Sequence, residues 1–278
     1  MASCSAKEQT PLLTGDIAAN DSVMITAYYD IDGDIYLEEF FSDSLGRFTY
    51  NPAIPTGTDL TLYINGTSYG VRLENGSTSN ISIDSAGTAT FSGANVAESR
   101  WLNECFNGYN SRRFKHVVAR DGAYDPAKYT EMLEGARDLT ASLLPEVKND
   151  SLRAYYERLG AQFYNRTKAN IIMSDFYYNK YDKESGVREM PAEYQELMKA
   201  DPNGDEARRT GALVEWLYSV PTDRGADYIE KLNAMCDSID KKIINPANKR
   251  MLFNSCSEIL FNYNMSVDNI RTFMDGMG

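Results

Sequence analysis

The first third of the chain alternates apolar and polar positions with the two-residue period of β-strands. In residues 60–64, for example, Leu and Ile alternate with Thr and Tyr. Such alternation buries one face of each strand against a core. Turn signals such as Asn65-Gly66 recur about every ten residues, a cadence typical of antiparallel sheets. Residues 11–95 are therefore predicted to form an antiparallel β-sandwich.

After Gly93 the apolar spacing changes to the 3.6-residue period of helices. One run ends at Pro145, and the next helix is expected to be capped by Asp150 or Ser151. Further helices are predicted over 150–181, 192–200, 205–219, 225–241 and 246–262, with a last one from Ser266. The predicted fold class is α+β: a tether over residues 1–10, the sandwich over 11–95, and an all-α helical domain over 96–278.

Charge and composition exclude one class of partner. The 278 residues carry a formal net charge of -12, whereas nucleic-acid binding relies on clustered Lys and Arg. The basic run Arg112–His116 is interpreted as the solvated face of a helix. No apolar run approaches the length of a membrane span, so membrane contact is expected only through an attached lipid.

The sequence offers no complete catalytic set. His116 is the single histidine, and the cysteines contain no C-x-x-C pair. The acidic run from Asp30 resembles the start of a calcium loop, but Ile35 and Phe41 occupy the positions that need Gly and Glu. We predict no catalytic residue, no metal site and no cofactor in these residues.

Two cysteines lie on successive predicted helices. Cys236 and Cys256 can form a disulfide if those helices pack antiparallel. The alternative is that both are buried free thiols that pack as small apolar side chains. The sequence leaves these two states open.

Aromatic residues are densest over 176–181. Consecutive aromatics on one helix cannot all face the same core, so at least one is expected to meet another helix, a domain or a ligand. The candidate partner surface consists of Tyr177, Tyr178 and Tyr181. Packing between domains and stacking on a sugar are the two interpretations.

The N-terminus resembles that of a bacterial lipoprotein. In Met1-Ala2-Ser3-Cys4-Ser5, a cysteine follows small residues and precedes a polar run. The resemblance implies that Cys4 carries a lipid and that the protein faces the periplasm in the cell envelope. The alternative is an ordinary N-terminus with an incidental cysteine, because the signal segment that decides between them is not in the sequence.

Several Asp-Ser-aliphatic tripeptides resemble the acceptor used for O-glycosylation of exported proteins in Bacteroidetes. Ser44 and Ser85 lie on predicted hairpin turns and are the best candidates of this kind. The same tripeptides are also what turns and helix caps produce, so a purely structural role stays open.

The β region also resembles a known family. Asp43–Tyr50, Leu73–Gly76, Ile81–Asp84 and Phe91–Asn95 resemble turns and strands of the N-terminal region that precedes thioredoxin-like domains in Bacteroidetes thiol-disulfide oxidoreductases. The resemblance implies a non-catalytic accessory region that positions substrate, with a thioredoxin-like domain in cis or an envelope protein as partner. No Trp-Cys-x-x-Cys motif lies within these residues, so no redox residue is carried over. The alternative function is a stand-alone envelope module that binds a peptide or a glycan.

Overall fold

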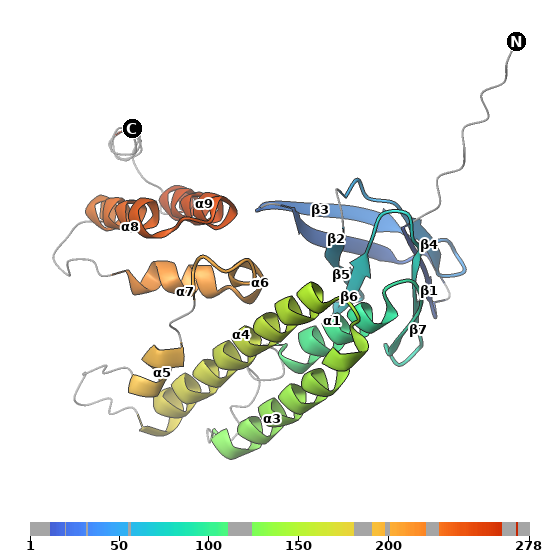
Figure 1. Ribbon diagram of the computed structural model, residues 1–278, viewed down its shortest axis with the longest axis horizontal. Helices are drawn as coiled ribbons and strands as arrows, with labels where there is room; N and C mark the ends of the chain where they lie inside the picture. Colours follow the sequence, from blue (N-terminus) through green and yellow to red (C-terminus); the bar gives the residue numbers. More distant parts are fainter. Residues whose placement is uncertain are drawn as a thin grey trace, which may run out of the picture. The chain divides into compact units, whose positions relative to one another are not determined.

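The computed structural model describes residues 12–19, 21–31, 33–54, 57–110, 124–180, 191–197, 201–220, 228–262 and 271. Within these residues all strands precede all helices, in a mixed α/β fold with two four-stranded sheets and eight α-helices (Figure 1). The predicted order, strands first and helices second, is confirmed.

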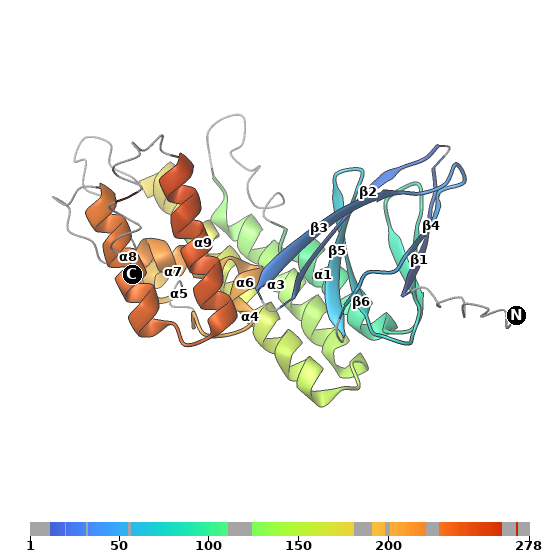
Figure 2. The same cartoon turned by 90° about the horizontal axis from the view of Figure 1, so that it is seen from above.

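Two sheets make up the β region. Sheet A has the order β4-β1-β7-β8 and sheet B the order β3-β2-β5-β6. The strands of sheet A are β4 (Arg47–Tyr50), β1 (Leu13–Ile17), β7 (Ser79–Ile83) and β8 (Ala89–Gly93). The strands of sheet B are β3 (Asp34–Phe41), β2 (Met24–Ile31), β5 (Thr58–Ile64) and β6 (Thr67–Leu73). Figure 2 shows β2 and β3 as long neighbouring strands.

One strand pair departs from the antiparallel prediction. β1 runs parallel to β7, with Leu13 opposite Ser79 and Ile17 opposite Ile83. The pairs of β1 with β4, β2 with β5, β5 with β6 and β7 with β8 are antiparallel. Because no hairpin turn joins β1 to β7, local sequence does not fix their relative direction. Sheet A is therefore a mixed sheet.

Inward-facing side chains of both sheets belong to one hydrophobic cluster. Its most buried members are Leu13, Ile25, Ala27, Leu60, Leu62, Ile64, Val71, Leu73 and Ile81. Gly15 stands where the Phe48 ring needs room, because a Cβ on Gly15 would lie 2.1 Å from the ring. The glycine thus leaves room for the Phe48 ring against the middle of β1.

The helices are α1 (Val96–Gly108), α3 (Pro126–Leu143), the 3-10 turn η1 (Leu144–Glu146), α4 (Asp150–Asp175), the π-helical turn η2 (Phe176–Lys180), α5 (Ala192–Leu197), α6 (Ala207–Thr210), α7 (Ala212–Ser219), α8 (Tyr228–Lys242) and α9 (Pro246–Asn262). None of the described helices has both the length and the hydropathy that a membrane span requires.

Two details of the helices differ from the prediction. The single helix expected over 205–219 is divided into α6 and α7 by Gly211, which adopts a left-handed φ of 69°. The N-terminal turn of α4 is capped by Asn149, whose Oδ1 accepts the Leu152 N–H at 3.0 Å, and not by Asp150 or Ser151. The predicted helix from Ser266 lies outside the described residues.

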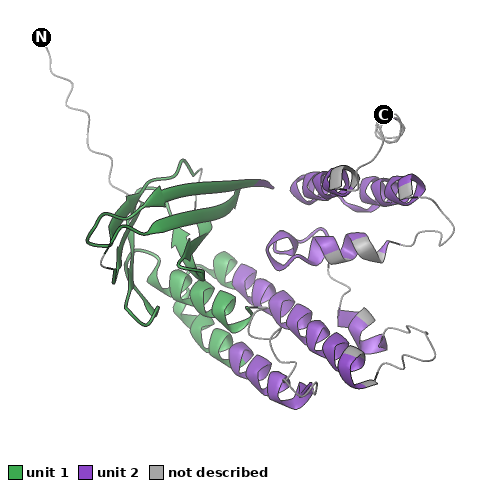
Figure 3. Ribbon diagram, turned by 180° about the vertical axis from the view of Figure 1, so that it is seen from behind, with its two compact units in different colours: residues 1–31, 35–110, 138–153 green, residues 32–34, 111–137, 154–278 purple. Residues whose placement is uncertain are grey.

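The chain forms two compact units (Figure 3). Unit 1 comprises residues 1–31, 35–110 and 138–153, and unit 2 comprises residues 32–34, 111–137 and 154–278. In unit 1, the Trp101 indole N–H on α1 donates to the Thr140 carbonyl at 3.1 Å, which ties α1 to the end of α3. Unit 2 has its own apolar core, formed by α6, α7, α8 and α9.

Candidate functional site

The outermost strand of sheet B, β3, leaves its apolar side chains largely exposed. Ile35 is 50% exposed, Leu37 62% and Phe41 64%, whereas the neighbouring β2 and β5 bury their inward faces. Edge strands in soluble proteins are usually short, charged or covered, because an exposed apolar edge attracts other strands. An eight-residue edge strand with exposed apolar side chains at Ile35, Leu37 and Phe41 is therefore a candidate binding surface.

The inner face of β3 is held firmly. The Tyr36 ring stacks on Tyr29 with centroids 5.1 Å apart, and the Phe40 ring stacks on Tyr50 at 4.6 Å. Between them, the Glu38 carboxylate accepts hydrogen bonds from the Tyr29 hydroxyl at 2.6 Å and the Tyr50 hydroxyl at 2.9 Å. These contacts fix the strand in position without covering its outer side chains.

Burial keeps this clamp protonated into the alkaline range. Burial, with help from the hydrogen bond to Glu38, raises the pKa of Tyr29 to about 12. The same two causes, in the same order, raise the pKa of Tyr50 above its ordinary value. Both hydroxyls therefore stay protonated and remain hydrogen-bond donors to the carboxylate.

The register of β3 follows from contacts at its two ends. Tyr29 stacks on Tyr36, and the Ser42 N–H donates to the Val23 carbonyl at 3.0 Å. Both contacts fit one antiparallel register, in which alternate residues of β3 bond to β2. The residues whose backbone groups then point away from β2 are Ile35, Leu37, Glu39 and Phe41. In the described part of the chain, β2 is the only strand that neighbours β3.

The side chains of the same residues project to the outer face of sheet B. Leu37 and Phe41, together with Met24 on β2 and Tyr63 on β5, form what we call the outer patch. Met24 is 50% exposed and Tyr63 44%. Glu39 is exposed and lies between Leu37 and Phe41 on this face. The outer patch is apolar, and the Glu39 carboxylate lies within it.

This arrangement is suited to binding. A rigid edge strand offers unpaired N–H and C=O groups in line, beside apolar side chains and an acid. An extended chain can add to such an edge as a further strand, with main-chain hydrogen bonds providing affinity and side chains providing selectivity. Nothing in the geometry of β3 brings an acid, a base and a nucleophile together.

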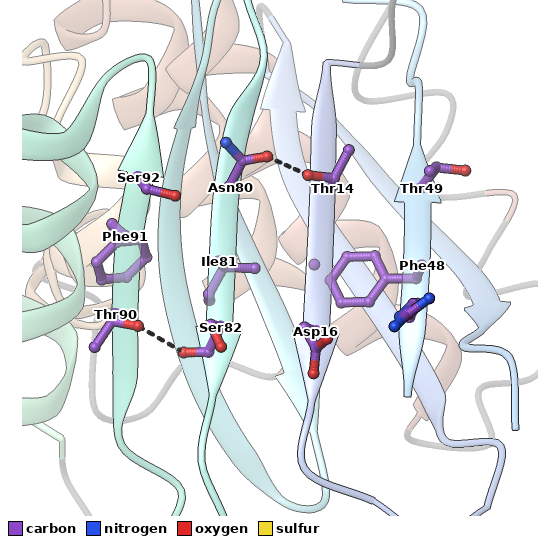
Figure 4. Close-up of a pocket in the computed structure, with 12 residues that line it drawn as sticks. Thr14, Asp16, Phe48, Thr49, Asn80, Ile81, Ser82, Thr90, Phe91 and Ser92 are labelled. Atoms are coloured by element: carbon purple, nitrogen blue, oxygen red, sulfur yellow. Dashed lines mark hydrogen bonds between the residues drawn. The ribbon is translucent and has the colours of Figure 1, made fainter. Parts of the chain in front are cut away.

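The outer face of sheet A is the contrasting surface (Figure 4). It forms a shallow depression of about 390 Å³, across which small polar side chains lie in two rows. The rows are Thr49, Thr14, Asn80 and Ser92, and Arg47, Asp16, Ser82 and Thr90. The Thr14 hydroxyl donates to the Asn80 amide oxygen, so part of this polarity is satisfied within the face. Phe48 packs into the core and offers no exposed ring for a sugar.

The two predicted glycosylation serines lie on turns of the same construction. At Ser44, the preceding Asp43 carboxylate accepts the N–H groups of residues 45 and 47 at 2.9 and 2.8 Å. At Ser85, the Asp84 carboxylate accepts those of residues 86 and 88 at 2.9 and 2.8 Å. Both serines are exposed. The turn geometry explains the aspartates, and modification of the serines stays a prediction.

The predicted aromatic surface is described in part. Tyr178, in the π-helical turn, is 50% exposed and stacks on Tyr124 with centroids 6.2 Å apart. Tyr124 stacks in turn on the buried Tyr129 at 5.2 Å. Tyr181, the side chain of Tyr177 and the predicted lipid site Cys4 lie outside the described part of the chain. Their roles stay predictions.

Sequence reasoning did not identify β3 as a site. The run from Ile35 to Phe41 has apolar residues on both alternating faces, which predicts a buried strand as readily as an open one. One signal in the sequence indicates that the strand is exposed. Glu38 and Glu39 lie within this apolar run, and two adjacent acids are rare in a fully buried strand. Among the described residues, no group of three or more metal-ligating side chains occurs.

Comparison of the chain with models of known families, with curated proteins and with solved structures finds no match. The resemblance to the N-terminal region of thiol-disulfide oxidoreductases therefore stays a prediction. The features of this chain that bear on function are the geometry of β3 and the outer patch.

Proposed function

We propose that this chain is a binding protein that captures an extended polypeptide segment by pairing it with β3. The finer fold that goes with this proposal is a β-sandwich, in which sheets A and B face each other across one shared core. The observation that carries the proposal is the open edge of β3, which is anchored on its inner face and exposed on its outer one.

The chemistry of the edge describes the partner. Leu37 and Phe41 favour apolar side chains on the same face of the incoming strand. Glu39, between them, favours a lysine or arginine directly opposite it. The acidic net charge of the chain adds a long-range attraction for basic segments. The expected ligand is a short strand in which apolar and basic residues share one face.

The energetics are those of a reversible interaction. Covering an exposed Leu or Phe side chain contributes about 1.5–3 kcal/mol, and each net hydrogen bond about 1 kcal/mol. Association and ordering of a flexible segment cost on the order of 4–15 kcal/mol. Because the gain and the cost are of similar size, binding is expected to be reversible, which suits a module that holds a partner and releases it.

Of the two functions expected from the sequence, this proposal develops the peptide-binding one. It is also compatible with an accessory region that holds the substrate of an envelope oxidoreductase. The open backbone edge of β3 favours peptide over glycan, because a peptide main chain can pair with it as a further strand and a sugar cannot.

A designed peptide tests the proposal. The probe is a fluorescent, end-blocked Val-Thr-Lys-Thr-Ile-Thr-Val, which places Lys opposite Glu39 and Ile opposite Leu37 in antiparallel pairing. Fluorescence anisotropy with the full chain should give saturable binding at roughly micromolar concentrations. The same peptide with N-methyl groups on Lys and Ile loses two strand hydrogen bonds and should bind at least about tenfold more weakly.

Two protein variants locate the binding. Phe41→Ala removes about 2 kcal/mol of apolar contact, or roughly thirtyfold in affinity. Leu45→Ala is the matched control, because Leu45 is equally exposed at 64% but lies in the β3–β4 turn. Equal binding of the N-methylated and unmethylated peptides would contradict strand pairing.

A further inference from the structure

The last two described long helices form a tight hairpin in unit 2. α8 ends at Lys242 and α9 begins at Pro246, so only a three-residue link joins them. The Asn245 carboxamide oxygen accepts the N–H groups of Ala247 and Asn248 at 3.1 and 3.2 Å, which caps α9. The Asn203 carboxamide oxygen accepts the N–H of Ile244 at 2.7 Å, which holds the link in place.

This hairpin places two cysteines side by side. Cys236 on α8 and Cys256 on α9 belong to the same apolar cluster, with Leu232, Ile239 and Leu252 around them. Their sulfur atoms are hydrogen-bonded to each other, and both are free thiols. Of the two states that the sequence left open, the structure contains the buried thiols, but in contact with each other.

The two thiols differ in character. Cys256 is fully buried, whereas Cys236 is 7% exposed. The hydrogen bond from Cys256 lowers the pKa of Cys236, and the same bond, together with burial, raises the pKa of Cys256. Cys236 is therefore the better nucleophile of the two.

We infer that Cys236 and Cys256 are a reversible disulfide pair that links α9 to α8 when the protein meets a disulfide oxidant. This inference is independent of strand binding at β3. The two thiols are within hydrogen-bonding reach of each other on one helical hairpin and in one apolar cluster, which is the proximity that a disulfide needs. No other pair of described cysteines shares an apolar cluster in this way.

The reaction balances with a small disulfide such as oxidised glutathione. The Cys236 thiolate attacks one glutathione sulfur, the glutathione S–S bond breaks, and one glutathione thiolate leaves. The Cys256 thiol then gives its proton to a glutathione thiolate and attacks the Cys236 sulfur, which displaces the second glutathione. The protein loses two hydrogen atoms, and one oxidised glutathione becomes two reduced molecules.

The test is equilibration of the full chain in glutathione buffers of increasing oxidised fraction, followed by acid quench, alkylation and peptide mass mapping. We expect one linked peptide that joins Cys236 to Cys256 and loses two hydrogen atoms. Cys105, buried on α1, is the internal reference and should remain alkylatable. The linked form should have an unfolding midpoint about 5–10 °C higher, because a disulfide restricts the unfolded chain.

Two controls keep the inference testable. Cys236→Ala and Cys256→Ala should each abolish the linked peptide and the oxidant-dependent rise in the unfolding midpoint. In denaturing urea, at the same ratio of oxidised to reduced glutathione, the fraction of chains with the Cys236–Cys256 link should fall at least about tenfold. The reason is that the folded hairpin holds the two thiols close together. Both thiols remaining alkylatable in the most oxidising buffer, or pairing mainly with Cys105, would overturn the inference. So would a linked fraction that urea leaves unchanged.

Discussion

The two edges of sheet B differ in how they are covered. At β6, α1 packs on the strand so closely that a Cβ on Gly70 would lie 2.7 Å from the Leu102 Cβ. The Arg72 N–H donates to the Ser99 hydroxyl at 3.0 Å, and the Arg72 carbonyl accepts from the Ser79 hydroxyl at 2.8 Å. Both edge-facing backbone groups of Arg72 are thus satisfied by the chain itself, and α1 covers the outer face of β6.

Within unit 1, the described residues provide no comparable cover over residues 35–41 of β3. Its inner side chains are clamped by Tyr29 and Tyr50, but its outer ones remain exposed. The apolar residues of the outer patch are better explained by an external strand than by the fold of unit 1.

The largest expected difference is in stability. Leu102→Ala leaves a cavity beneath α1 and should lower the free energy of unfolding by about 2–5 kcal/mol. Leu37→Ala, at the open edge, should change it by no more than about 0.5 kcal/mol. Urea denaturation of both variants measures the contrast. A loss of several kcal/mol at Leu37 would mean that the edge is covered in solution.

Two adjacent glutamates sharpen the comparison of the inner and outer faces. Glu38→Ala leaves two buried tyrosine hydroxyls without their acceptor and should cost about 1–2 kcal/mol of unfolding free energy. Glu39→Ala should leave stability within about 0.5 kcal/mol and weaken binding of the lysine-containing peptide. The two variants remove the same residue type from the same strand. Equal free energies of unfolding for Glu38→Ala and Glu39→Ala would therefore contradict the clamp.

The clamp also predicts a pH dependence of stability in the alkaline range. The pKa of Tyr29 is about 12 in the folded chain, against an ordinary value of 10.0. Between these values the folded chain binds more protons than the unfolded one, so stability present below pH 10 is lost as the pH rises. The expected loss is about 1.4 kcal/mol per pH unit from this group. Urea unfolding at several pH values from 9 to about 11.5 measures this loss. The free energy of unfolding should fall less steeply with pH for Tyr29→Phe than for the unchanged chain. Tyr63→Phe is the control and should fall as steeply as the unchanged chain.

Local sequence signals predicted much of this fold. The change of period near Gly93 separated strands from helices, and α8 and α9 lie within a few residues of their predicted bounds. These elements have strong periodicity and clear turn residues, which act over short distances. The position of Gly211 shows where such signals fail, because a helical pattern on both sides of a glycine reads as one helix.

Contacts between distant segments could not be predicted from the sequence. The parallel pair of β1 and β7 joins strands more than sixty positions apart, for instance Leu13 and Ser79. The open edge of β3 depends on which strands neighbour it, and alternation alone does not specify the order of strands. The contact of Cys236 with Cys256 likewise required the packing angle of two helices, although their spacing had suggested it.

The most direct test of the central claim is amide hydrogen exchange along β3, followed by NMR in the full chain. In the free protein the N–H groups of Leu37 and Glu39 should exchange about tenfold or more faster than those of Glu38 and Phe40, which bond to β2. Addition of the Val-Thr-Lys-Thr-Ile-Thr-Val peptide should slow exchange at Leu37 and Glu39 and leave the other two unchanged. Uniform protection along β3 before any peptide is added would contradict an open edge, and so would peptide-induced protection confined to other strands.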